Sequence, residues 1–169
     1  KLYFMIGLPT ETDEDVLAIP QLAEKILQEN PGKKDFTITI SVSTFVPKPH
    51  TPFQWAPVID FPETKRRQDL IKMNLRSRRI QFRYHDARTS LLEAIMSRGG
   101  RELGKVIITA YNAGCRFDAW QENFQYDKWL EAFTSCGFDI QELLKEIPLD
   151  KELPWDIIKT GVPKGYLEK

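Results

Sequence analysis

The chain contains too few cysteines and histidines for most metal centres. Among its 169 residues are two cysteines, Cys115 and Cys136, and two histidines, His50 and His85. A four-cysteine zinc site needs four thiolates, a His-rich site needs several histidines, and a disulfide framework needs several cysteine pairs. The counts therefore exclude a four-cysteine zinc site, a His-rich metal site and a disulfide-rich scaffold. They leave a single Cys115–Cys136 disulfide, which we do not expect because nothing in the sequence indicates secretion.

Long apolar runs and an excess of one charge are also absent. No apolar stretch approaches the roughly 18 residues that a membrane-spanning helix requires, so we expect no membrane partner. The 24 basic and 24 acidic residues give a net charge of zero, which does not indicate nucleic-acid binding. Hydrophobic residues make up 41% and charged residues 28% of the chain, a composition typical of a globular protein. We expect a cytoplasmic one.

The chain opens on a segment that predicts a buried strand. Leu2-Tyr3-Phe4-Met5-Ile6 is apolar throughout and precedes Gly7, which is typical of a strand covered on both faces. A strand of this kind needs neighbours in a sheet. We therefore expect the chain to be a fragment, with the missing N-terminal part of its own chain as partner. Pairing with a second copy through the free strand edge is the alternative.

The next segments predict a βαβ unit. Thr12 and Asp15 form a capping box that opens a helix, and Pro20 is expected to kink it or force a restart. Residues 36–46 alternate with period two and predict a second strand, and Ile80–Tyr84 predicts a third. Strand–helix–strand implies a parallel pair with a right-handed crossover. Further helices are predicted from a Ser90–Glu93 capping box and over 101–113, 125–135 and 139–146.

Two segments that follow predicted strands are candidate binding segments. Gly7-Leu8-Pro9-Thr10-Glu11-Thr12 lies at a strand-to-helix junction, where α/β folds bind ligands, although an ordinary βα turn has the same form. Residues 46–53, Val-Pro-Lys-Pro-His-Thr-Pro-Phe, follow the second strand and are stiffened by prolines. This loop either holds Lys48 and His50 towards a substrate or is a rigid connector. We expect both segments on one rim of the sheet.

A basic segment follows the proline-rich loop. Residues 65–88 contain nine basic and two acidic side chains, and Lys65, Lys72, Arg76 and Arg79 would share one face of a helix over 62–79. Such a stripe can contact the phosphates of an RNA substrate, although a solvated helix face is the more frequent explanation. The candidates for nucleic-acid contact are Lys65, Arg66, Lys72, Arg76 and Arg79.

Three weaker features lie beyond residue 80. His85-Asp86 is either a site or the start of a turn, and turns commonly begin with Asp. Cys115 beside Arg116 is either a reactive thiol or a buried free cysteine, and the buried case is commoner. Five aromatic residues near helical spacing are predicted to belong to the core: Phe117, Trp120, Phe124, Trp129 and Phe133.

The order of these motifs resembles a known superfamily. Strand–GLPTET–helix, then strand–FVPKPHTPF and a basic helix, resembles the last third of the catalytic barrel of radical S-adenosylmethionine (radical SAM) enzymes. There the two segments read like a GFPGET turn and a PRPGTP loop. Four later segments resemble the C-terminal extension of an uncharacterised, cobalamin-domain-linked branch of that superfamily. They are Arg83–Asp86, Ser97–Arg101, Cys115–Trp120 and Pro154–Gly161.

The resemblance implies a fold class and a division of the chain. Residues 1–79 would be the C-terminal part of a partial (β/α) TIM-like barrel, with about three mostly parallel strands. Residues 80–169 would form a mainly helical extension.

The resemblance also implies cofactors. The full-length protein would use S-adenosylmethionine and a 4Fe-4S cluster, and would cleave the former reductively to start radical chemistry on an unknown substrate. Carried over, Gly7, Leu8, Pro9 and Glu11 would lie near the adenosine side of the barrel mouth. The superfamily's three-cysteine CxxxCxxC loop does not occur in this sequence. We therefore expect the fragment to hold no metal or cofactor and to be inactive alone. The alternative is a non-catalytic RNA- or protein-binding module that uses the basic helix.

Overall fold

The computed structural model describes residues 1–32 and 35–168, and it is a mixed α/β protein. Three parallel strands form one open sheet, and helices make up most of the remaining regular structure. The chain divides into two compact units. The first contains residues up to 45 together with 59–90, and the second contains 46–58 together with residue 91 onward. We placed the domain boundary after residue 79, before the third strand. In the structure the third strand belongs to the same unit as the first two.

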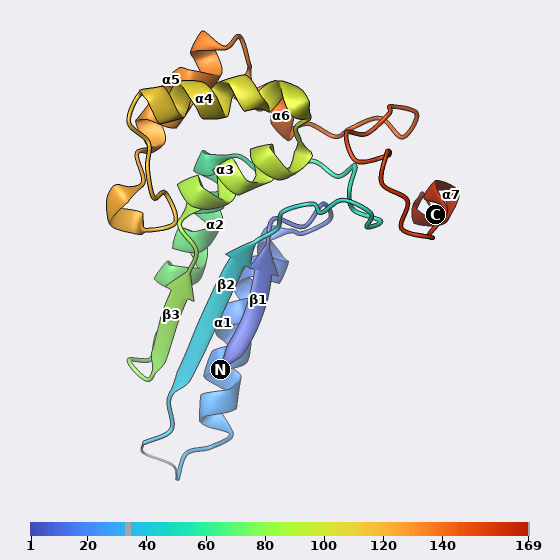
Figure 1. The fold of residues 1–169 in the computed structure, drawn as a ribbon. Coiled ribbons are helices and arrows are strands. Elements are labelled where there is room, and N and C mark those ends of the chain that lie inside the picture. Colours follow the sequence, from blue (N-terminus) through green and yellow to red (C-terminus); the bar gives the residue numbers. More distant parts are fainter. Residues whose placement is uncertain (33–34, 169) are drawn as a thin grey trace. The chain divides into compact units, whose positions relative to one another are not determined.

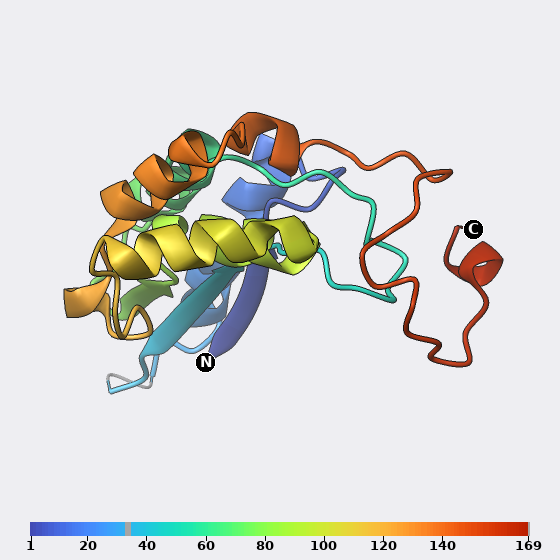
Figure 2. The same ribbon diagram turned by 45° about the horizontal axis from the view of Figure 1, so that its top comes forward.

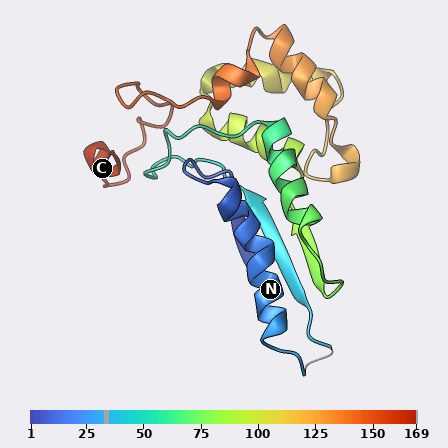
Figure 3. The same cartoon turned by 180° about the vertical axis from the view of Figure 1, so that it is seen from behind.

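The first unit is built on strands that follow one another in chain order. β1 (Leu2–Ile6), β2 (Ile38–Thr44) and β3 (Ile80–Tyr84) lie in the order β1-β2-β3 and are all parallel (Figure 1). α1 (Asp13–Gln28) joins the first pair and α2 (Phe61–Met73) precedes the third strand. Seen from the helix side in Figure 3, both crossovers are right-handed. The predicted strands and their parallel pairing are confirmed.

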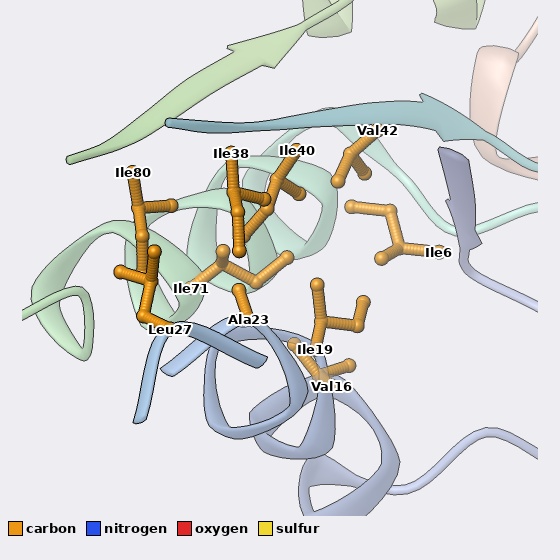
Figure 4. Close-up of a cluster of buried hydrophobic side chains, with 10 residues drawn as sticks. All are labelled: Ile6, Val16, Ile19, Ala23, Leu27, Ile38, Ile40, Val42, Ile71 and Ile80. Carbon is orange, nitrogen blue, oxygen red and sulfur yellow. The ribbon is translucent and has the colours of Figure 1, made fainter. Parts of the chain in front are cut away.

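One apolar layer joins the sheet to its helices. Alternate residues of the strands point towards α1 and α2, while the facing helix residues recur at helical spacing (Figure 4). Both helices therefore pack on the same face of the sheet. The layer contains Ile6, Val16, Ile19, Ala23, Leu27, Ile38, Ile40, Val42, Ile71 and Ile80.

The prediction that β1 is buried on both faces is wrong for the residues described. Leu2, Phe4 and Ile6 face the helices, but Tyr3 is 74% and Met5 46% exposed. The cause is the one-sided packing, because α1 and α2 leave the opposite face of the sheet uncovered within this unit. β1 is also an edge strand of the sheet.

Two helix predictions in the first unit can be compared with the structure. α1 runs through Pro20 without a restart, although proline cannot donate the usual bond to the carbonyl of Val16. Pro20 is buried in the apolar stripe of the helix, and that packing outweighs the missing bond. α2 ends at Met73 rather than near 79, because Asn74 caps it and bonds back to Leu70. Arg76 and Arg79 thus lie beyond the helix.

The predicted capping box at Ser90 is also wrong. α3 (Ala87–Arg98) begins three residues earlier, because the Asp86 carboxylate accepts hydrogen bonds from the backbone of Arg88 and Thr89. The Ser90 hydroxyl instead donates to the Asp86 carbonyl. Asp86 therefore has a structural role, as the cap of α3 rather than the start of a turn.

The second unit is mainly helical. It contains η1 (Arg101–Leu103), α4 (Gly104–Asn112), η2 (Gln121–Asn123), α5 (Tyr126–Ser135), α6 (Ile140–Leu144) and α7 (Lys164–Leu167). α4 and α5 lie side by side (Figure 2). Trp129 and Phe133 are buried as predicted, but Phe117 and Trp120 are 70% and 56% exposed, so those two are not core.

Cys115 and Cys136 are both free. Burial raises the pKa of the Cys115 thiol, which supports a buried thiol rather than a reactive one. In the described part of the chain, every helix is too short or too polar to cross a bilayer.

The apolar layer predicts a large effect of truncating its centre. Ile40→Ala should lower the free energy of unfolding of the first unit by about 2–5 kcal/mol, because it leaves a cavity between β2 and the helices. Ile108→Ala, on an exposed position of α4, is the matched control and should change stability by less than about 0.5 kcal/mol. Urea denaturation measures both. Equal effects of the two substitutions would contradict the layer described.

Candidate functional site

The turn after β1 is held by the side chain of one of its own residues, Glu11. Gly7 has φ +89°, and the Glu11 carboxylate accepts its N–H at 2.7 Å. The Leu8 carbonyl accepts the Glu11 N–H at 3.1 Å. A Cβ at position 7 would lie 2.8 Å from the Ile59 side chain, so glycine is required for both the backbone conformation and the space.

An ion-pair network joins this turn to the first half of α2. The Arg67 guanidinium donates to Glu11 and, at 2.7 Å, to Glu63. Arg66 bonds to Glu63 at 2.6 Å and to Asp13, at the start of α1, at 2.7 Å. The Glu11 and Arg67 side chains are only 7% and 12% exposed, so their pair is the part of the network least weakened by water.

The network also sets the acidity of its central carboxylate. Hydrogen bonds from Arg66, and then from Arg67, lower the pKa of Glu63 from 4.5 to about 2. The hydrogen bond from Arg66 likewise lowers the pKa of Asp13. Both acids therefore remain ionised at neutral pH, and the two arginines are held in fixed positions between them.

The structure brings the four predicted cofactor-binding residues into one turn, in two different roles. Gly7 and Glu11 direct their hydrogen bonds inward and shape the turn. Leu8 is half-buried, while Pro9 and the neighbouring Thr10 are exposed at the carboxyl end of β1. Only this outer part of the turn is available to a ligand.

A second group of residues lies on the face of the sheet opposite α1 and α2. Tyr3 pairs in register with Ser41, and Ser41 pairs with Arg83, so the three form a row across β1, β2 and β3. Tyr3 and Arg83 are exposed and Ser41 is half-buried. Thr39 and Ser43 lie on the same face of β2. This face, with a phenol, three hydroxyls and a guanidinium, suits a polar ligand.

We did not predict this row from the sequence, although its signal was available. The alternation over 36–46 places Thr39, Ser41 and Ser43 opposite the apolar residues of β2. The alternation of β3 likewise places Arg83 on that face. The role of Arg67 and Glu63 in fixing Glu11 was also missed, because they are more than fifty positions apart from it in the chain.

The predicted rim residues Lys48 and His50 belong to the second unit. Lys48 is exposed and pairs with Glu93 of α3 at 2.5 Å. His50 has φ +59°, and its backbone N–H donates to the Gln54 side chain at 3.0 Å. It lines a pocket in that unit.

The predicted nucleic-acid contacts are not equally available. Lys65 pairs with Asp69 at 2.7 Å, and Arg66 is held between Glu63 and Asp13. Lys72 is exposed near the end of α2, whereas Arg76 and Arg79 follow it in the connection to β3. The five side chains therefore do not form one stripe on one helix.

Comparison with known proteins adds one relative. No family model matches the chain, and no solved structure matches it. The chain is 32% identical over 139 residues to an uncharacterised protein of the archaeon Methanocaldococcus jannaschii. The match covers 81% of this chain but 29% of that protein, so the chain spans less than a third of the length of its curated relative. The similarity brings no activity with it.

Removing the Glu11 charge tests the role of the turn. Glu11→Gln should lower the free energy of unfolding by about 2–3 kcal/mol, because Arg67 and the Gly7 N–H lose a nearly buried carboxylate. Glu14→Gln, exposed in the first turn of α1, is the control and should cost less than about 1 kcal/mol. Chemical denaturation at pH 7 compares them. A Glu11→Gln protein as stable as the control would show that Glu11 does not hold the turn.

The depressed pKa of Glu63 makes stability pH-dependent. Its folded-state pKa of about 2 lies below its ordinary value of 4.5, so its contribution is complete above about pH 4.5 and is lost as pH falls towards 2. Glu63→Gln removes this contribution, which is on the order of 1–3 kcal/mol for a partly exposed group.

Urea midpoints of both proteins across this pH range measure the effect. The stability difference between wild type and Glu63→Gln should shrink as pH falls. A difference that stays constant would rule out the proposed coupling.

Proposed function

We propose that the chain is the C-terminal part of the barrel of a radical SAM enzyme, followed by a helical extension. The full-length protein would cleave S-adenosylmethionine reductively and use the resulting radical on a substrate. The motif resemblance supplies the superfamily. The arrangement of the first unit supplies independent support.

The order and one-sided packing of the sheet carry this proposal. In (β/α) barrels, consecutive parallel strands are neighbours and every helix lies on the outer face. Doubly wound folds instead place helices on both faces and reverse the strand order. Here β1, β2 and β3 are consecutive neighbours, and α1 and α2 pack on the same face. The opposite face carries Met5 and otherwise mainly polar side chains such as Ser41 and Arg83, as expected of a barrel interior that binds a ligand.

The position of the GLPTET turn agrees with this assignment. Active sites of (β/α) barrels lie at the carboxyl ends of the strands. The turn begins at Gly7, directly after β1, and the Glu11–Arg67 pair fixes its shape. We infer that Gly7 and Glu11 position Pro9 and Thr10 at the rim, and that Arg83 and Ser41 orient the polar part of a ligand on the sheet face.

The residues of this chain do not fit an iron–sulfur cluster. Such clusters are held by several thiolates, and the chain has two cysteines, of which Cys115 is buried. Among residues 1–32 and 35–168, no three potential metal ligands come together. Cluster ligands would therefore come from elsewhere in the full-length protein. The chain's own contribution is binding and orientation. Two free cysteines agree with a cytoplasmic location.

The rival proposal, an RNA- or protein-binding module, has less support. Its cationic stripe is interrupted by the ion pairs of Lys65 and Arg66, which would have to be broken or shared for phosphate contact. RNA remains a candidate substrate for the enzyme.

Anaerobic assay of the full-length protein tests the enzymatic proposal. After reconstitution with iron and sulfide, it should release 5′-deoxyadenosine from S-adenosylmethionine when a reductant is added. The 169-residue chain serves as control and should bind no cluster, because it lacks the thiolates. A cluster-loaded protein that never cleaves S-adenosylmethionine would overturn the proposal. Stoichiometric iron and sulfide in the short chain carrying Cys115→Ser and Cys136→Ser would also contradict it.

A further inference from the structure

The second unit contains a pocket of about 490 Å³ between the proline-rich loop and the C-terminal tail. His50 and Gln54 line it from the loop, and Asp156, Lys159, Gly161 and Lys164 line it from the tail. Figure 2 shows the tail lying beside the loop. The volume falls within the range of sites for small organic ligands.

The wall of the pocket is held together by one buried amide. The Gln54 side-chain oxygen accepts the His50 backbone N–H at 3.0 Å and the Trp155 indole N–H at 2.7 Å. Trp155 is buried with Trp55, Leu153 and Leu167 in an apolar cluster. The Pro154-Trp155-Asp156 motif therefore fixes the tail to the loop, so the pocket is a built feature of the unit.

His50 lies in the wall of this pocket. Its backbone is in the left-handed region, a conformation that costs free energy for a residue other than glycine. Its imidazole Nε2 is buried and has no hydrogen-bond partner within the described parts of the chain. A buried nitrogen without a partner is destabilising, but protein atoms already cover this one, so it is not a contact point for a ligand in the pocket.

The charge of the pocket selects the kind of ligand. Lys159 is exposed and takes part in no ion pair among residues 1–32 and 35–168. Lys164 contacts the Asp156 carboxylate at 3.6 Å, a long distance for an ion pair, and donates to the Lys151 carbonyl at 3.2 Å. The lining thus has more positive than negative charge, and Thr160 adds a hydroxyl next to Lys159.

We propose that this pocket binds the phosphate group of a small organic molecule. Two ammonium groups and a hydroxyl match a doubly charged, tetrahedral phosphate better than a singly charged, planar carboxylate. Lys159 and Lys164 bind the phosphate oxygens, and the Thr160 hydroxyl donates to the same group. The pocket lies wholly in the second unit, so this proposal does not depend on radical chemistry.

Titration of the 169-residue chain with inorganic phosphate tests the proposal. Two-dimensional ¹H–¹⁵N NMR at fixed pH and ionic strength should show saturable shifts at the His50 imidazole and at the amides of Thr160 and Gly161. Acetate should bind at least about tenfold more weakly, because it carries a single charge.

Two variants and one control complete the test. Lys159→Glu should weaken phosphate binding about tenfold or more, since it replaces a cation with an anion. His50→Asn should also weaken it, because it removes the imidazole from the pocket wall, while asparagine tolerates the left-handed backbone at this position. Lys105→Glu, an exposed lysine of α4 outside the pocket, should change the affinity by less than about twofold. The amide spectra report whether each variant is folded.

Three outcomes would overturn the proposal. They are the absence of saturable shifts at the pocket residues, acetate binding as tight as phosphate binding, and equal weakening by Lys159→Glu and Lys105→Glu.

Discussion

The packing of α1 and α2 on a single face of the sheet is the constraint on which the first unit depends. It buries Ile38, Ile40 and Val42 against the helices and, by the two-residue period of the strand, turns Thr39, Ser41 and Ser43 to the other face. The hydrophobic layer and the polar face are therefore two consequences of the same alternation. A one-residue slip of β2 would exchange them, so stability and ligand binding select the same register.

The ion pair between Glu11 and Arg67 connects this packed layer to the turn at the carboxyl end of β1. Arg67 lies on α2, whose position is fixed by Ile71 in the apolar layer. Through Glu11 it fixes the turn after β1, which no backbone ladder reaches. A nearly buried ion pair stabilises little compared with hydrophobic burial, but it allows few alternative geometries. That property suits a turn whose shape has to be constant at a ligand-binding rim.

Sequence periodicity predicted the sheet well because strand burial is a local pattern. The bounds of β3 and the buried face of β2 follow directly from alternation. The errors arose where a particular helix cap, or the packing of segments distant in the chain, decides the outcome. Asn74 ends α2 by a short-range cap, and Asp86 starts α3 before Ser90. Tyr3 is exposed because α1 and α2 pack on the opposite face of the sheet. The Glu11–Arg67 pair and the Gln54–Trp155 bond join positions 56 and 101 apart, and no periodicity reveals such contacts.

The two candidate binding regions are built on different physical principles. The sheet face is pre-formed by backbone pairing, so its Tyr3–Ser41–Arg83 row keeps its spacing whether or not a ligand is bound. The pocket depends instead on a tail with little regular structure that is held at Trp155 and Leu167. Its lysines lie on the segment between these anchors, where Lys159 takes part in no ion pair among the described residues and Lys164 contacts Asp156 and the Lys151 carbonyl. A ligand bound there would help to order the tail that forms its site, so ligand binding and ordering of the tail are linked. The tail motif thus has a physical reason to combine a buried tryptophan with exposed cations. The tryptophan holds the segment in place, and the cations are there to bind the ligand.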